Sequence, residues 1–154
     1  MNDIYAIHVA KTEVREGYNT GDVDRIAGVF RATGFTDMSE GQPSQYGLEA
    51  ASVLRQRLES LFSAFWVKMT PIVIDVVVGG DSAYDYGWHE YTLTPKSCGE
   101  PIRKRERYFE LWSKDAKAQW KIAMYFTNGD VREEVNGAFT RWFLSEERTA
   151  LDSH

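Results

Sequence analysis

The chain has 154 residues, of which 43% are hydrophobic and 27% are charged. This length fits one domain, and the composition is that of a globular protein rather than a disordered one. The formal net charge of -5 would repel phosphate backbones, so we do not expect nucleic acid as a partner.

Helical periodicity dominates the first part of the chain. Apolar residues at helical spacing predict a first helix that ends at Gly21, followed by a short second helix over 23–30. A strand-like segment follows at 35–40. A third helix is predicted from about 48 to 65, because its apolar side chains form one wide face. All three helices therefore precede the main sheet.

From residue 67 the apolar period changes to two, which is the pattern of strands. Gly-rich and Pro-containing turns separate successive runs, so they predict hairpins and an antiparallel meander. The four predicted strands span 72–78, 83–93, 102–112 and 120–127.

A helical pattern returns near the end of the sequence. Val135, Phe139 and Trp142 share one face of an amphipathic helix predicted over about 131–147. We therefore expect one domain over residues 1–130, extended by a helical segment of the same domain over 131–154.

Four short segments carry a more specific pattern. They are YNTGDVD at 18–24, GDSAY at 80–84, and FELW at 109–112 followed by WKI at 120–122. In this order and spacing they resemble the nuclear transport factor 2-like superfamily, in particular its SnoaL-like (polyketide cyclase-like) domains, over about residues 4–130. The resemblance implies an α+β, cystatin-like fold. In that fold a cone-shaped, curved antiparallel sheet wraps around the three N-terminal helices and a small-molecule pocket.

The resemblance leaves the function open, because this superfamily includes cyclases, isomerases, dehydratases and non-catalytic binding or assembly domains. Aligned without gaps on residues 19–22, the ketosteroid isomerase pattern places its tyrosine at Val14 and its base carboxylate at Met38. Both positions differ from that pattern, which is evidence against steroid isomerisation. A shift of one residue would restore the carboxylate at Asp37.

Alternate side chains of a strand face opposite sides of its sheet. In the predicted strand 83–93, the set that contains the small residues Ala83 and Gly87 is expected to face the helices, and it also contains Asp85 and His89. A half-buried histidine is suited to general acid–base work when a carboxylate holds its tautomer. The equally supported alternative is that Asp85 and His89 only satisfy buried polar partners.

We predict His89, Asp85 and Asp37 as catalytic residues, with Asp37 or Asp75 as the carboxylate nearest to the imidazole; Glu110 and Asn128 are further candidate neighbours. Core packing remains the simpler interpretation of the aromatic residues near the pocket. The predicted ligand is a small apolar or aromatic molecule, and its predicted contacts are Tyr18, Trp66, Asp75, Tyr91 and Asn128.

The other face of strand 83–93 carries Tyr84, Tyr86 and Trp88. A stripe this aromatic is unsuited to open solvent, so we predict that it forms a homodimer interface. With the opposite parity, these three residues would instead line the pocket, and Asp85 and His89 would lie on the surface.

No cofactor or metal is expected, because the sequence contains no phosphate-binding loop and its three histidines are widely scattered. Two functions remain open, a cofactor-independent proton-transferring enzyme and a non-catalytic binding or assembly domain. We expect a cytoplasmic protein without a membrane partner, because Cys98 is the single cysteine and no apolar run is long enough for a signal peptide or a membrane span.

Overall fold

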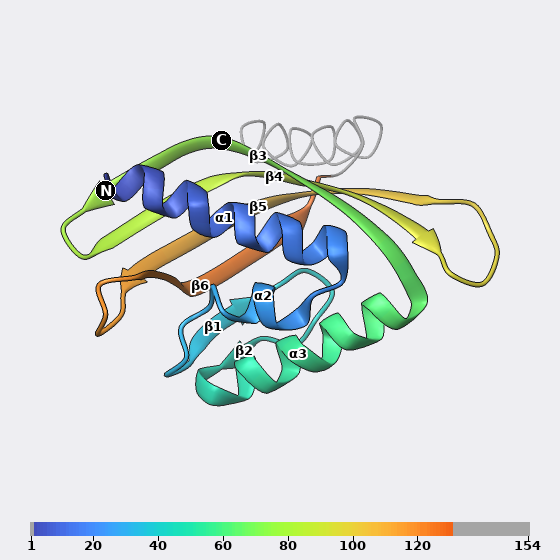
Figure 1. Cartoon of the computed structure of the whole chain (residues 1–154), viewed down its shortest axis with the longest axis horizontal. Coiled ribbons are helices and arrows are strands. Elements are labelled where there is room, and N and C mark those ends of the chain that lie inside the picture. Colours follow the sequence, from blue (N-terminus) through green and yellow to red (C-terminus); the bar gives the residue numbers. More distant parts are fainter. Residues whose placement is uncertain (1, 131–154) are drawn as a thin grey trace, which may run out of the picture.

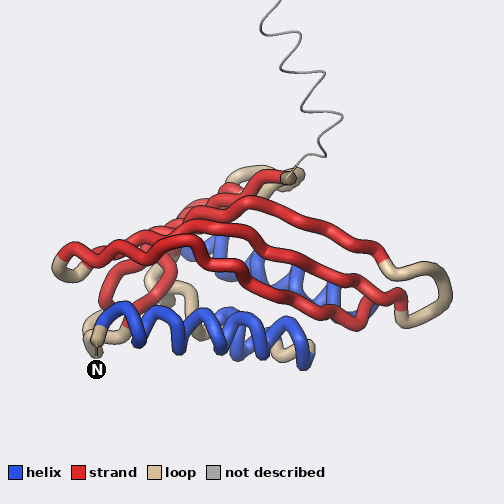
Figure 2. Tube along the Cα trace, turned by 90° about the horizontal axis from the view of Figure 1, so that it is seen from above, coloured by secondary structure: helices blue, strands red, loops and turns tan. Residues whose placement is uncertain are grey.

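The computed structural model describes residues 2–130, and the helix predicted over 131–147 lies outside them. The described chain forms two layers, in which three helices cover one face of a six-stranded sheet (Figure 1). The helices are α1 (Asp3–Thr20), α2 (Val23–Ala27) and α3 (Gly47–Ala64). Figure 2 shows the sheet curving over this helical layer. The predicted α+β architecture with three N-terminal helices is therefore confirmed.

The sheet has the strand order β2-β1-β6-β5-β4-β3. Its antiparallel meander runs through β3 (Phe65–Gly79), β4 (Ser82–Pro95), β5 (Ile102–Lys114) and β6 (Trp120–Gly129). The short strands β1 (Phe35–Met38) and β2 (Gln45–Tyr46) extend it, and β1 runs parallel to β6. The sheet is thus mixed rather than wholly antiparallel. No hairpin joins β1 to β6, so no turn fixes their relative direction.

Local signals explain where the first two helices begin and where α1 ends. The side chain of Asn2 accepts a hydrogen bond from the backbone N–H of Ile4, and the side chain of Asp22 accepts one from Arg25 in the same way. Gly21 adopts a left-handed conformation with φ of 71° and ends α1, as the sequence predicts.

The core lies between the two layers. Each large apolar side chain that is buried there contributes about 1.5–3 kcal/mol to folding. Both layers contribute side chains to this core, chiefly Ile7, Ile26, Phe35, Leu58, Met69, Trp112 and Ile122. None of the described helices is long and apolar enough to cross a membrane.

A bulge interrupts the pairing of β3 with β4 between Val73 and Asp75. Asp75 is an even number of positions away from Val67 and Met69, whose side chains are buried. In an unbroken strand its side chain would therefore face the helices as well. The extra residue reverses this parity, and Asp75 is exposed. The prediction that Asp75 lies beside His89 is therefore wrong.

Candidate functional site

A cavity of about 210 Å³ lies between α3 and the concave face of β4, β5 and β6. Leucines of α3 and β4 form its apolar wall, and Tyr18, Tyr91 and Tyr125 bring phenol rings to it. The rings of Tyr18 and Tyr91 meet edge to face, with centroids 5.6 Å apart. The cavity therefore combines an apolar interior with several hydroxyl groups, as small-molecule sites do.

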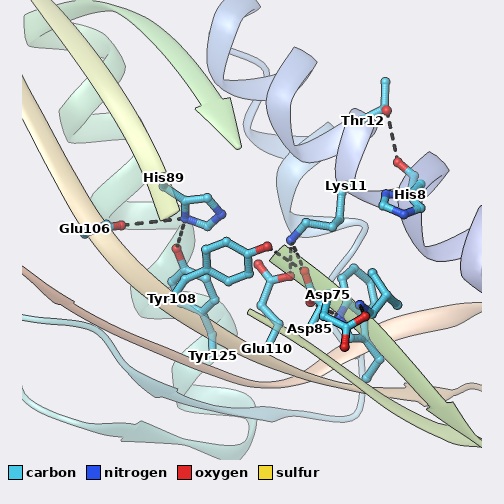
Figure 3. Close-up of polar contacts among 12 residues, drawn as sticks. His8, Lys11, Thr12, Asp75, Asp85, His89, Glu106, Tyr108, Glu110 and Tyr125 are labelled. Carbon is cyan, nitrogen blue, oxygen red and sulfur yellow. Dashed lines mark hydrogen bonds and ion pairs between the residues drawn. The ribbon is translucent and has the colours of Figure 1, made fainter. Parts of the chain in front are cut away.

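His89 is buried behind this cavity, with 1% of its surface exposed. Its ring stacks on that of Tyr108 at a centroid distance of 4.1 Å. Its Nδ1 atom lies 3.2 Å from the hydroxyl of Tyr125 and 3.9 Å from Oε1 of Glu106 (Figure 3). Burial lowers the pKa of His89, so the imidazole is neutral near pH 7. His89 itself does not line the cavity and reaches it through Tyr125 and Glu106.

The carboxylate nearest to His89 is thus Glu106 and not Asp37 or Asp75. Glu106 lines the cavity, and Nζ of Lys104 lies 2.9 Å from its Oε2 atom. Burial alone would raise the pKa of Glu106. The hydrogen-bond donors of His89 and Lys104 outweigh burial, and they hold this pKa below its usual value. The cavity wall therefore contains an ionised carboxylate.

Asp37 also lines the cavity, but its oxygens are occupied. It accepts hydrogen bonds from the backbone N–H of Ser39 at 3.0 Å and from the Ser39 hydroxyl at 2.5 Å. It also forms an ion pair with the guanidinium of Arg57 on α3. The sequence-predicted base is thus hydrogen-bonded to Ser39 and paired with Arg57.

Asp85 lies in a separate buried cluster with Lys11 and Glu110 (Figure 3). Nζ of Lys11 lies 2.8 Å from Oδ2 of Asp85 and 2.5 Å from Oε2 of Glu110. Tyr108 and Trp112 donate their O–H and N–H groups to the Asp85 carboxylate at 2.8 and 2.7 Å. Asp85 is not among the residues that line the cavity, and it is linked to His89 through the ring of Tyr108.

Three predicted ligand contacts lie outside the cavity. Trp66 is 67% exposed, and Lys96 lies over its ring. Asp75 is exposed because of the bulge in β3. Asn128 lies on the outer face of β6, where its side chain accepts a hydrogen bond from Nε of Arg107 at 2.8 Å. Only Tyr18 and Tyr91 of the five predicted ligand contacts line the cavity.

The outer sheet face carries an apolar surface that spans several strands. Tyr84 and Tyr86 of β4 are both 38% exposed, and Tyr84 stacks on Phe109 of β5. The indole of Trp88 is half-buried beneath the guanidinium of Arg105. We call this surface the outer-face patch, made of Tyr84, Tyr86, Trp88, Phe109, Leu111 and Phe126.

Within residues 2–130, no three His, Cys, Asp or Glu side chains are grouped in a way that could hold a metal ion. The carboxylates of Asp85, Asp37 and Glu106 pair instead with cations of the chain itself, namely Lys11, Arg57 and Lys104.

Comparison with known proteins shows similarity of structure. No protein-family model matches the sequence, and no curated protein matches it. A ketosteroid isomerase-like protein from Erwinia carotovora atroseptica matches with a TM-score of 0.72 and 22% identity, covering 86% of this chain and 100% of that one. A candidate dehydratase of the NTF2-like family from Streptomyces avermitilis matches with a TM-score of 0.67 and 14% identity, covering 84% and 97%.

A domain of unknown function with a cystatin-like fold from Nostoc punctiforme matches with a TM-score of 0.68 and 15% identity, covering 97% of this chain and 93% of that one. These similarities agree with the helical layer, the curved sheet and the strand order described above. The chain therefore has the cystatin-like α+β fold of the nuclear transport factor 2-like proteins.

Proposed function

We propose that this chain binds a small apolar or aromatic molecule in the cavity and moves a proton on it without a cofactor. The observation that carries this proposal is the ionised Glu106 carboxylate in the cavity wall, beside the hydroxyl groups of three tyrosines. A carboxylate that removes a proton and a phenol that donates one are the two halves of general acid–base catalysis. The reaction class is isomerisation, dehydration or cyclisation.

In this proposal the roles of the predicted residues change. Glu106 is the base and Tyr125 is the hydrogen-bond donor, because both line the cavity. His89 is a positioning residue, since its Nδ1 atom lies close to both groups but is not exposed to the cavity. Asp85 supports the ring of Tyr108, on which His89 stacks.

The solved structures favour this class of chemistry, since two of them are named as isomerase-like and dehydratase proteins. The alternative is a non-catalytic ligand-binding domain. It is favoured by the pairing of two cavity carboxylates with cations, Asp37 with Arg57 and Glu106 with Lys104. A paired carboxylate is a weaker base, so binding without chemistry is a coherent second function.

Exchange of the methyl protons of acetophenone in deuterium oxide, followed by proton NMR, tests this proposal. We expect the protein to accelerate the exchange, and we expect Glu106→Gln to reduce this acceleration by about 10²-fold or more. Glu100→Gln is the matched control, because Glu100 is exposed in the loop after β4. If wild type and Glu106→Gln exchange the protons at the same rate while both bind acetophenone, the result favours the non-catalytic ligand-binding domain.

We also propose that a second copy of the chain covers the outer-face patch. Its exposed aromatic side chains lie on one continuous sheet surface, which suits a self-complementary contact. The lone exposed thiol of Cys98 supports a cytoplasmic location, where free thiols stay reduced.

A further inference from the structure

The apolar surface on the outer side of the sheet is wider than one helix. The outer-face patch spans β4, β5 and β6, and the exposed Ile72 and Val77 of β3 extend it. Neighbouring strands lie about 4.8 Å apart, so four strands give an apolar width of about 14 Å. A surface of this size is unsuited to water. A helix about 10 Å across would cover two of its strands and leave two for another contact.

The described part of the chain ends on this outer side. The backbone N–H of Asp130 donates a hydrogen bond to the carbonyl oxygen of Arg105 at 3.2 Å, and its carboxylate lies 3.2 Å from Nε of Arg105. The guanidinium of Arg105 lies over the ring of Trp88, which belongs to the outer-face patch. The segment that follows Asp130 therefore starts from β6 beside this patch.

The sequence of that segment fits the patch in length. Val135, Phe139 and Trp142 share one face of the helix predicted over 131–147, and about 10 Å separates the first from the last along the helix. Outward side chains of one strand recur about every 7 Å, so three of them span about 13 Å. A helix that turns back along β6 would place this stripe over the β5 and β6 part of the patch, made of Phe109, Leu111 and Phe126.

The charges where β6 ends agree with this direction. The outer side of β5 carries three successive basic residues there, Arg103, Arg105 and Arg107. Within residues 2–130, only Arg105 of these three forms ion pairs, with Glu90 and Asp130. Glu133 and Glu134 directly precede the apolar stripe, and Arg132 offsets one of their two charges. A helix that turns back after Asp130 would set this acidic start over the basic end of β5.

We propose that residues 131–147 pack as an amphipathic helix on the outer face of their own chain, with Phe139 against Phe109 and Phe126. This inference goes beyond the proposed function, and it divides the outer-face patch between two contacts. The helix covers the β5 and β6 part. The β4 part remains for the second copy and consists of Tyr84, Tyr86 and Trp88.

Disulfide trapping in the full chain tests this proposal. The trapped pair combines Phe139→Cys with Phe126→Cys in a Cys98→Ser background. The matched control combines Phe139→Cys with Val77→Cys, because Val77 is exposed to a similar extent, 37% against 39%, but lies three strands away on the same face. Under mild oxidation the first pair should close within one chain about tenfold faster than the control, because docking raises the effective concentration of that thiol alone.

Hydrogen–deuterium exchange of the unaltered chain is a second measurement that needs no variant. A helix of this length that contains Gly137 is marginal in water by itself, so slow exchange over 131–147 requires packing. We expect slow exchange there. Exchange at the rate of an unstructured peptide would overturn the proposal, even if the cysteine variants fail to fold.

The outcomes also separate this proposal from the proposed dimer. Equal closure rates of the two cysteine pairs would overturn docking on β5 and β6. A disulfide that joins two chains would place the segment on the second copy and overturn docking on its own chain. A wild-type mass of one chain would refute the dimer, whereas fast closure within that chain would still support the docked helix.

Discussion

The buried cluster of Lys11, Asp85 and Glu110 holds one cation between two carboxylates. Two ionised carboxylates here would leave one negative charge unpaired, which is costly in a buried site. Burial accordingly raises the pKa of Glu110 to about 8, although Lys11 opposes the rise. Asp85 receives three donors and stays ionised, because Lys11 and its hydrogen bonds outweigh the effect of burial on its pKa.

We predict from this cluster that stability falls as the pH rises from 6.5 to 8. Unfolded Glu110, with its ordinary pKa of 4.5, has already released a proton that the folded chain retains until about pH 8. The free energy of unfolding should therefore decrease by about 1–2 kcal/mol across this window. The lowered pKa of His89 has the opposite effect, but only below its ordinary value of 6.5.

Urea unfolding at both ends of the window measures this slope. Glu110→Gln should flatten the slope, because the amide does not titrate, and Glu100→Gln should leave it unchanged. A Glu110→Gln variant with the full wild-type slope would show that another group retains the proton.

At the scale of single residues, sequence reasoning placed the side chains of β4 correctly but missed most of their partners. The burial of Asp85 and His89 was predicted from strand parity together with the expectation that the face with Ala83 and Gly87 points toward the helices. The burial of Lys11 was predictable from the sequence, since Lys11 shares a helix face with Ile7 and Val14. Glu106 was overlooked because basic residues flank it in the sequence. Its contact with His89 also depends on the register between β4 and β5, which the sequence pattern does not determine.

At the scale of elements, Gly87 is tied to the bulge in β3. A Cβ atom at Gly87 would lie 1.9 Å from the backbone oxygen of Ile72. The bulged strand therefore requires a glycine here, whereas the sequence suggested that a small residue serves the approach of the helices. Glycine in a strand interior often marks such a close backbone approach.

Gly87→Ala should therefore destabilise the protein by at least about 1–3 kcal/mol, because the backbone of β3 has to move. Gly79→Ala is a matched control on the neighbouring strand, since a Cβ atom there would meet nothing within 4 Å. Thermal or urea unfolding of the two variants measures the difference. Equal stability of both variants would mean that the bulge relaxes at little cost.

The helices and the meander were predictable because caps, turns and periodicity are local signals. The pairing of β1 with β6 and the bulge in β3 were not, because both depend on chain segments that meet only in the folded protein. This difference explains why Asp37 was placed near His89: the direction in which β1 enters the sheet carried no signal in the sequence.

At the scale of the whole molecule, the sheet separates the cavity from the outer-face patch. Successive residues of β4 serve the two sides, with Asp85 and His89 inside and Tyr84, Tyr86 and Trp88 outside. A partner on the outer face would immobilise the strand that carries His89 and its neighbour that carries Glu106. Rigid support of this kind keeps site residues in productive geometry.

We predict that the chain is a homodimer through the outer-face patch, with twice the mass of one chain in sedimentation at micromolar concentration. Tyr86→Lys combined with Trp88→Lys should shift it to monomer, because an apolar contact that buries two ammonium groups is strongly destabilised. Leu48→Lys is the control, since Leu48 is a highly exposed apolar residue on α3, away from the patch. A wild-type mass equal to one chain would refute the dimer. A wild-type dimer that persists in the double variant would place the interface elsewhere on the molecule.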